Sequence, residues 1–169
     1  NLIVNENSLG NLVISSENLS KENDKSDLTI NNEANTNLKL SPEDEFQQAF
    51  DLLRSQQFDD AKIALKKFID DNKESNLAGS AHYWLGEIYI LRKEYREAAL
   101  VLAEGYQKYP NSVKAPDILY KLSESLIKID KNKEACSTFK KLSTEHPNHK
   151  LLHKSQVRIS ELECVIAVE

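Results

Sequence analysis

Three histidines near the C-terminal end are the residues whose type and spacing come closest to a metal site. His146 and His149 stand three residues apart, and His153 follows four residues later. Imidazoles at such spacings bind zinc when one helix presents them on one face. Pro147 and Asn148 interrupt any helix between the first two histidines. The three rings should therefore not converge, and we predict no metal and no cofactor.

Two pairs of adjacent acids, Asp59-Asp60 and Asp70-Asp71, raise the question of acid–base catalysis. Neighbours in sequence do not face one another on a helix, so neither pair is suited to flank a substrate. The sequence also contains no phosphate-binding loop, no GxSxG and no HExxH. We therefore predict that the protein is not an enzyme and has no catalytic residues.

The two cysteines, Cys136 and Cys164, are too few for a disulfide framework. Cys136 follows Ala135 within a helical pattern, so we expect it to be a small buried core residue. A disulfide between the two cysteines is the alternative. The sequence leaves it open, because it does not give the separation of the two Cα atoms.

The composition narrows the protein class. Four glycines and four prolines in 169 residues favour long helices. A net charge of −5 without a basic stripe argues against nucleic acid as a partner. Apolar runs are far shorter than the ~20 residues of a membrane span, so we predict no spanning helix. The sequence has no Met and no visible signal peptide, and we expect a chain whose targeting segment has been removed.

Two regions differ in pattern. Residues 1–40 hold ten Asn and no aromatic residue, which predicts a flexible arm or a coiled-coil remnant. Ser41-Pro42-Glu43-Asp44 then gives an N-cap, a proline at the first helical position and two acids at the positive end of the helix dipole. From there to about residue 165 apolar residues recur three and four apart, so 41–169 is the predicted folded domain.

The sequence matches itself when it is shifted by 37 residues. One column of small residues comprises Ala49, Gly86 and Ser123, and a second comprises Ala61, Ala98 and Ala135. A period of this length indicates stacked helix pairs whose small residues let two helices approach closely. We predict an all-α solenoid of three pairs in units 42–75, 79–112 and 116–149, closed by a capping helix over 149–165. Residues 76–78 and 113–115 should lengthen the first helix of the next pair.

The middle unit resembles the tetratricopeptide repeat at Leu85, Gly86, Tyr89, Ala98, Gly105 and Pro110. The strings AHYWLGEIY, YPNSVKAPD, KLSESL and NKEAC are similar to the C-terminal domain of the periplasmic cell division coordinator family, CpoB or YbgF, of the Tol–Pal system. This resemblance covers about residues 45–163.

The resemblance implies a periplasmic protein that links peptidoglycan synthesis to outer-membrane constriction. Its implied partners are TolA and a bifunctional penicillin-binding synthase. Family members also trimerise through an N-terminal coiled coil, of which residues 1–40 hold at most a remnant. A homo-oligomer formed through the N-terminal region is therefore left open.

The first helices of stacked pairs line a concave groove, which is the expected partner site. The predicted groove residues are Phe46, Phe50, Leu53, Tyr83, Glu87, Ile90, Tyr120, Glu124 and Ile127. Phe46, Tyr83 and Tyr120 should form an aromatic ladder along it, with both phenol groups open to water. Phe50 is expected to pack partly in the core, and Trp84 at the helix junction. Glu87 and Glu124 could equally be a solvated face.

Two other classes of tetratricopeptide protein are alternatives to the cell division coordinator. Another envelope tetratricopeptide scaffold, such as an outer-membrane assembly lipoprotein, fits the same repeats. A co-chaperone that clamps carboxylates needs Lys, Arg and Asn in the groove, where this sequence places acids. The sequence assigns no role to the apolar tail Val165-Ile166-Ala167-Val168.

Overall fold

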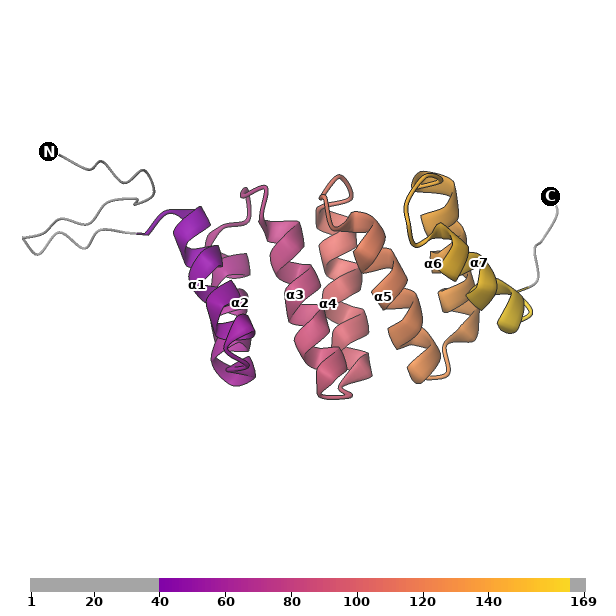
Figure 1. The fold of residues 1–169 in the computed structure, drawn as a ribbon, viewed down its shortest axis with the longest axis horizontal. Coiled ribbons are helices and arrows are strands. Elements are labelled where there is room, and N and C mark those ends of the chain that lie inside the picture. Colours follow the sequence, from indigo (N-terminus) through magenta and orange to yellow (C-terminus); the bar gives the residue numbers. More distant parts are fainter. Residues whose placement is uncertain (1–39, 165–169) are drawn as a thin grey trace, which may run out of the picture. The chain divides into compact units, whose positions relative to one another are not determined.

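The computed structural model describes residues 40–164, and within them the chain forms seven helices and no strands. The helices succeed one another in chain order across Figure 1. They are α1 (Pro42–Arg54), α2 (Phe58–Asp71), α3 (Ala78–Leu91), α4 (Tyr95–Lys108), α5 (Ala115–Lys128), α6 (Asn132–Glu145) and α7 (Leu152–Glu161). Each helix packs on the next one in sequence, which confirms the predicted solenoid of helix pairs.

The first helix begins where the sequence predicted. Ser41 caps α1, because its Oγ accepts a hydrogen bond from the Asp44 amide at 3.1 Å. Pro42 occupies the start of the helix, and three acids fill its first turn. Of the residues expected as an N-terminal arm, 1–40, all but Leu40 lie outside the described residues. Among the described helices, none has the combination of length and apolar character that a bilayer crossing requires.

The helices within a pair are joined by one recurring turn. Gln56, Lys93 and Asp130 follow α1, α3 and α5 with φ of 60°, 61° and 60°. The amide of the next residue then bonds back into the helix, as Glu94 does to the Tyr89 carbonyl at 2.9 Å. Such a left-handed residue with a backward amide bond is a standard helix end. The second helix starts directly after it, so the 37-residue period is visible in the backbone.

The turns before α3 and α5 correct the predicted helix starts. Ser75 Oγ accepts a hydrogen bond from the Leu77 amide at 3.2 Å, and Ser112 Oγ accepts one from the Lys114 amide at 3.2 Å. A hydroxyl that binds the backbone two residues onward holds a turn instead of a helix. Of each predicted three-residue extension, only the final alanine is helical.

The last helix is shorter than the predicted 149–165. His149 Nδ1 accepts a hydrogen bond from the Leu151 amide at 3.4 Å, at the place in the repeat where the first two units have serine. The helix therefore begins at Leu152. It ends at Glu161, because Glu163 adopts φ of 50° and the chain turns there.

Small residues allow the two helices of a pair to approach closely, as predicted. A Cβ placed on Gly86 would lie 2.5 Å from Leu102 Cδ2, and one on Gly105 would lie 2.5 Å from His82 Cβ. Leu102 is 0% exposed and His82 is 1% exposed. Neither neighbour has free space to move into, so the interface between α3 and α4 requires both glycines.

A disulfide joins Cys136 of α6 to Cys164 just after α7, with their Cα atoms 5.7 Å apart. Cys136 is half-buried, so the expectation of a buried core residue is wrong, and the disulfide that the sequence left open is the alternative that forms. The sequence could not show this, because the two residues meet only through the packing of α7 back on α6. The bond closes a loop at the C-terminal end of the array.

We predict that Gly105→Ala destabilises the protein by about 1–2 kcal/mol, because overpacking outweighs the better helix propensity of alanine. In a His82→Gly background the same change should cost less, because the obstructing Cβ of residue 82 is gone. Urea unfolding of the four proteins of this cycle measures both effects. A stabilising Gly105→Ala in the otherwise native chain would contradict the packing described here.

We predict that replacing Cys136 and Cys164 by serine lowers the free energy of unfolding by about 2–4 kcal/mol, because the unfolded chain gains freedom. Thermal unfolding with and without reductant provides the control. Reductant should lower the Tm of the native chain and leave that of the double variant unchanged. An equal Tm for both proteins without reductant would show that the bond adds no stability.

Candidate functional site

The first helices of neighbouring units meet through a repeated contact. Phe50, Glu87 and Glu124 stand 37 residues apart, and each contacts the side chain 34 residues further on. The resulting pairs, which we call the junction row, are Phe50–Trp84, Glu87–Lys121 and Glu124–Arg158. The row joins α1 to α3, α3 to α5 and α5 to α7. These four helices therefore share one layer, which we call the odd-helix face.

The first pair of the row belongs to an aromatic cluster. The Phe50 and Trp84 rings meet edge to face with centroids 5.2 Å apart, and Trp84 meets Tyr83 at 5.0 Å. Phe46 lies 6.4 Å from Phe50, one turn away on the same helix. Lys114 Nζ lies 4.8 Å from the Tyr83 centroid and 5.6 Å from that of Trp84. Trp84 is half-buried, so the cluster keeps an accessible aromatic surface with a cation beside it.

The other two pairs of the row are ionic. Lys121 Nζ lies 3.0 Å from Glu87 Oε1, and Arg158 Nε lies 2.8 Å from Glu124 Oε1. Arg158 also reaches Glu161 at 2.6 Å, and the two carboxylates raise the pKa of its guanidinium above the ordinary value. The side chains of the two pairs are 22–33% exposed. Pairs in such contact with water contribute about 0–1 kcal/mol each to stability.

The predicted groove residues lie on the odd-helix face, but their exposure differs from the prediction at one position. Tyr83 is only 9% exposed as a whole residue, so it lies deeper than the predicted groove position. Burial, with Glu87 and Asp117 nearby, raises the Tyr83 pKa to about 12. The remaining members are half-buried: Phe46, Phe50, Leu53, Glu87, Ile90, Tyr120, Glu124 and Ile127.

Two members of the predicted ladder, Phe46 and Tyr120, contact aromatic rings of the second helix in their own pairs. Phe46 meets Phe68 of its own pair, with ring centroids 5.5 Å apart, and Tyr120 meets Phe139 of its own pair at 5.7 Å. The aromatic contact that crosses between units is made one turn further along α1, by Phe50. The ladder position therefore packs within its own helix pair at Phe46 and Tyr120, whereas the Tyr83 ring contacts Trp84 and Lys114.

Sequence reasoning missed Lys121 and Arg158, and it assigned Trp84 to packing alone. These three residues share one column of the 37-residue repeat. The available signal was charge: a column with two acids is followed, 34 residues on, by a column with two bases. Side chains of opposite charge at a fixed offset in a repeat indicate contact between units.

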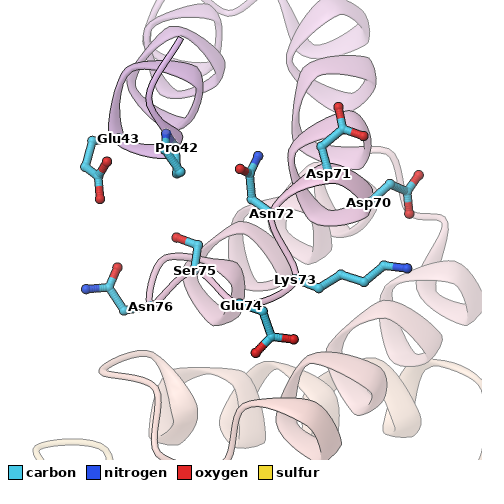
Figure 2. Close-up of a pocket in the computed structure, with 9 residues that line it drawn as sticks. All are labelled: Pro42, Glu43, Asp70, Asp71, Asn72, Lys73, Glu74, Ser75 and Asn76. Carbon is cyan, nitrogen blue, oxygen red and sulfur yellow. The ribbon is translucent and has the colours of Figure 1, made fainter. Parts of the chain in front are cut away.

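A second candidate is a hollow of about 660 Å³ between the start of α1 and residues 70–76, shown in Figure 2. Its walls carry Glu43, Asp70, Asp71 and Glu74, with Lys73 between them. Within residues 40–164, no group of His, Cys, Asp or Glu is arranged to hold a metal ion. Apart from Pro42, every side chain that lines the hollow is polar or charged, and none is aromatic, so the odd-helix face is the better candidate for a protein partner.

We predict a coupling of about 0.2–1 kcal/mol between Glu87 and Lys121, because the pair is formed but partly in water. Urea unfolding of Glu87→Gln, Lys121→Gln and the double variant measures it, and the coupling should shrink at high salt. Lys128→Gln, an exposed change on the same helix, is the matched control and should show no coupling to Glu87. Equal coupling for both lysines would exclude a specific pair.

Comparison with known proteins agrees with the helical repeat. The family model for the tetratricopeptide repeat matches residues 80–112 and 117–149, which correspond to α3–α4 and α5–α6. A search of curated proteins finds no match to the sequence. The resemblance to the cell division coordinator family thus stays a prediction.

Several solved structures share the fold. The Hsp90 co-chaperone Cns1 from Saccharomyces cerevisiae has a TM-score of 0.61 at 19% identity, over 72% of this chain and 39% of that chain. The type III secretion chaperone SycD from Yersinia enterocolitica has a TM-score of 0.58 at 18% identity, and the match covers 71% of this chain and 87% of SycD. PcrH from Pseudomonas aeruginosa has a TM-score of 0.60 at 16% identity, and the match covers 75% of this chain and 96% of PcrH. This chain therefore carries tetratricopeptide repeats in a fold that it shares with chaperones.

Proposed function

We propose that this protein is a non-enzymatic interaction module of the bacterial cell envelope, and that partners bind on the odd-helix face. The junction row is the observation that carries this proposal. It sets aromatic and charged side chains in a line across four helices and leaves most of them half-buried. A surface of this kind can bind a helix or an extended peptide over several repeats.

The chemistry of the row suits a protein partner. Trp, Tyr and Arg are the side chains that most often dominate binding energy at protein interfaces. The half-buried Trp84 offers an anchor, and Lys114 beside it offers a charge for an acidic group. The ion pairs further along can exchange one carboxylate for another at small cost, which favours selection by charge. SycD, which shares the fold, has been solved in complex with a peptide of the translocator YopD.

The disulfide supports an extracytoplasmic location. Such bonds persist in oxidising compartments, of which the bacterial periplasm is one. Together with the resemblance to the cell division coordinator family, the Cys136–Cys164 bond favours a periplasmic protein. We therefore propose a role between peptidoglycan synthesis and outer-membrane constriction, with TolA and a bifunctional penicillin-binding synthase as partners.

Trp84 provides a direct test, because it is the one tryptophan in the chain and lies within the proposed site. Titration of the full chain with the purified periplasmic part of TolA should produce a saturable change in tryptophan emission. Phe50→Ala should weaken this binding about tenfold, because it removes the ring that packs on Trp84. Lys121→Gln should weaken it less.

Leu100→Ala is the matched control. Leu100 is 67% exposed and lies on α4, outside the odd-helix face, so its loss should leave binding unchanged. Circular dichroism verifies that each variant is folded. If folded Phe50→Ala binds TolA as tightly as the native chain, the odd-helix face is not the site. If the native chain does not bind TolA, the assignment to the division coordinator is wrong.

A further inference from the structure

His82 of α3 is a buried imidazole with a hydrogen-bond partner for only one of its two ring nitrogens. The residue is 1% exposed, and its Nδ1 lies 3.1 Å from the Val101 carbonyl oxygen of α4. A carbonyl oxygen only accepts hydrogen bonds, so in the neutral ring Nδ1 carries the proton and Nε2 is left as an acceptor. Nε2 is buried and has no hydrogen-bond partner within residues 40–164. The proposed function gives this histidine no role.

The repeat shows that a polar pair can be satisfied at this place. Glu45 is the residue that aligns with His82, and Asn72 aligns with Tyr109. In the first unit Asn72 Nδ2 donates a hydrogen bond to Glu45 Oε2 at 2.7 Å. In the second unit the Tyr109 ring lies beside the imidazole, with ring centroids 5.6 Å apart. The Tyr109 hydroxyl donates to the Lys73 carbonyl at 3.0 Å, so the residue that would complete the pair is engaged elsewhere.

The charged groups around the imidazole do not supply the missing partner. On α4, the carboxylate of Glu104 forms an ion pair with Lys108 at 2.5 Å. An adjoining hollow of about 360 Å³ is lined by His82 and by further titratable side chains of α2, α3 and α4: Lys66, Asp70, Tyr89 and Glu97. Burial lowers the pKa of His82, and the charge of Lys108 lowers it further, whereas the bond to Val101 and the charge of Glu104 raise it. The neutral ring is therefore the favoured form inside the closed helix pair.

The ring cannot reach water while α3 and α4 stay together. A Cβ on Gly105 would lie 2.5 Å from His82 Cβ, so the two helices are in contact at this residue. A protonated imidazole needs acceptors for two N–H groups, and burying its charge without them is costly. Because the Val101 carbonyl serves only one of these groups, the charged form favours separation of α3 from α4.

We propose that His82 makes the middle helix pair sensitive to acid, because uptake of a proton at Nε2 loosens the contact of α3 with α4. The proton comes from water and adds to the Nε2 lone pair, and no other bond changes. The effect extends to the odd-helix face, because Tyr83 and Trp84 follow His82 directly on α3 and Trp84 forms the aromatic junction with Phe50. The middle pair is thus closed at neutral pH and opens in mild acid.

The direction of the pH dependence follows from the burial of the ring. In the unfolded chain the imidazole takes up a proton near its ordinary pKa of about 6.5. In the folded chain burial lowers the pKa of His82. The unfolded state therefore binds more protons below about pH 6.5, and stability is lost as the pH falls from there through the lower pKa of the folded state. Carboxylates ordinarily titrate near pH 4, so the range from about pH 6.5 to 5 isolates the histidines.

Urea unfolding of the full chain, followed by the emission of Trp84, tests the proposal, because the sole tryptophan lies two residues from His82 on α3. The equilibrium constant for unfolding should rise about tenfold between pH 7.5 and pH 5.5, one unit below the ordinary histidine pKa. His82→Asn retains a donor at the position of Nδ1 but takes up no proton in this range. It should remove the rise, whatever its effect on stability at neutral pH.

Two other histidines provide the controls. His153→Asn is the same change at an exposed position of α7, and it should leave the rise as in the native chain. His146→Asn tests the end of α6, because His146 Nε2 is also buried without a hydrogen-bond partner in the described part of the chain. If folded His82→Asn keeps the full rise, or if only His146→Asn removes it, the proposal is overturned.

Nuclear magnetic resonance of the native chain gives a measurement that needs no substitution. As the pH falls, the His82 Cε1–H resonance should shift only together with the amide resonances at the contact of α3 with α4. A His82 resonance that titrates near pH 6.5 while those amide resonances stay in place would show that the closed pair accepts the proton, and the proposal would be wrong.

Discussion

The close approach of two helices at a small residue is the constraint on which the whole array depends. Gly86 lies against Leu102 and Gly105 against His82, with no space for one more carbon atom. Ala49 and Ser123, which share the Gly86 column, are fully buried. Because each pair closes in the same way, each unit presents the same surface to the next. The units can then stack with a constant offset.

Because of that constant offset, the same two positions of the repeat meet at every junction of the row, whichever side chains they carry. Any side chain in the column of Phe50, Glu87 and Glu124 meets the side chain 34 residues later, so sequence alone decides whether a junction is aromatic or ionic. The aromatic junction contributes more stability than the half-exposed ion pairs. The ionic junctions instead allow the surface to select partners by their charge. One end of the odd-helix face is thus suited to hold an apolar group, and the other to discriminate among charges.

The sequence was sufficient for the features that recur. The period of 37, the Ser41 cap and the close contact at Gly86 each follow from local chemistry repeated along the chain. It was insufficient where two distant segments decide the outcome. Helical counting placed Tyr83 on the correct helix face, but its burial depends on neighbours such as Trp84 and Lys114. The Cys136–Cys164 bond likewise depends on how α7 packs on α6.

The C-terminal end of the array follows from the same constraint. A terminal helix in a stack has a neighbouring unit on one side only, and in α7 Ser155 is the one buried residue, against ten in α3. Packing therefore holds α7 less firmly than any first helix inside the array. A covalent bond to α6 supplies stability that sparse burial does not, because it limits the unfolded chain and needs no apolar partner. The disulfide thus reinforces α7, the last described helix, where few residues are buried.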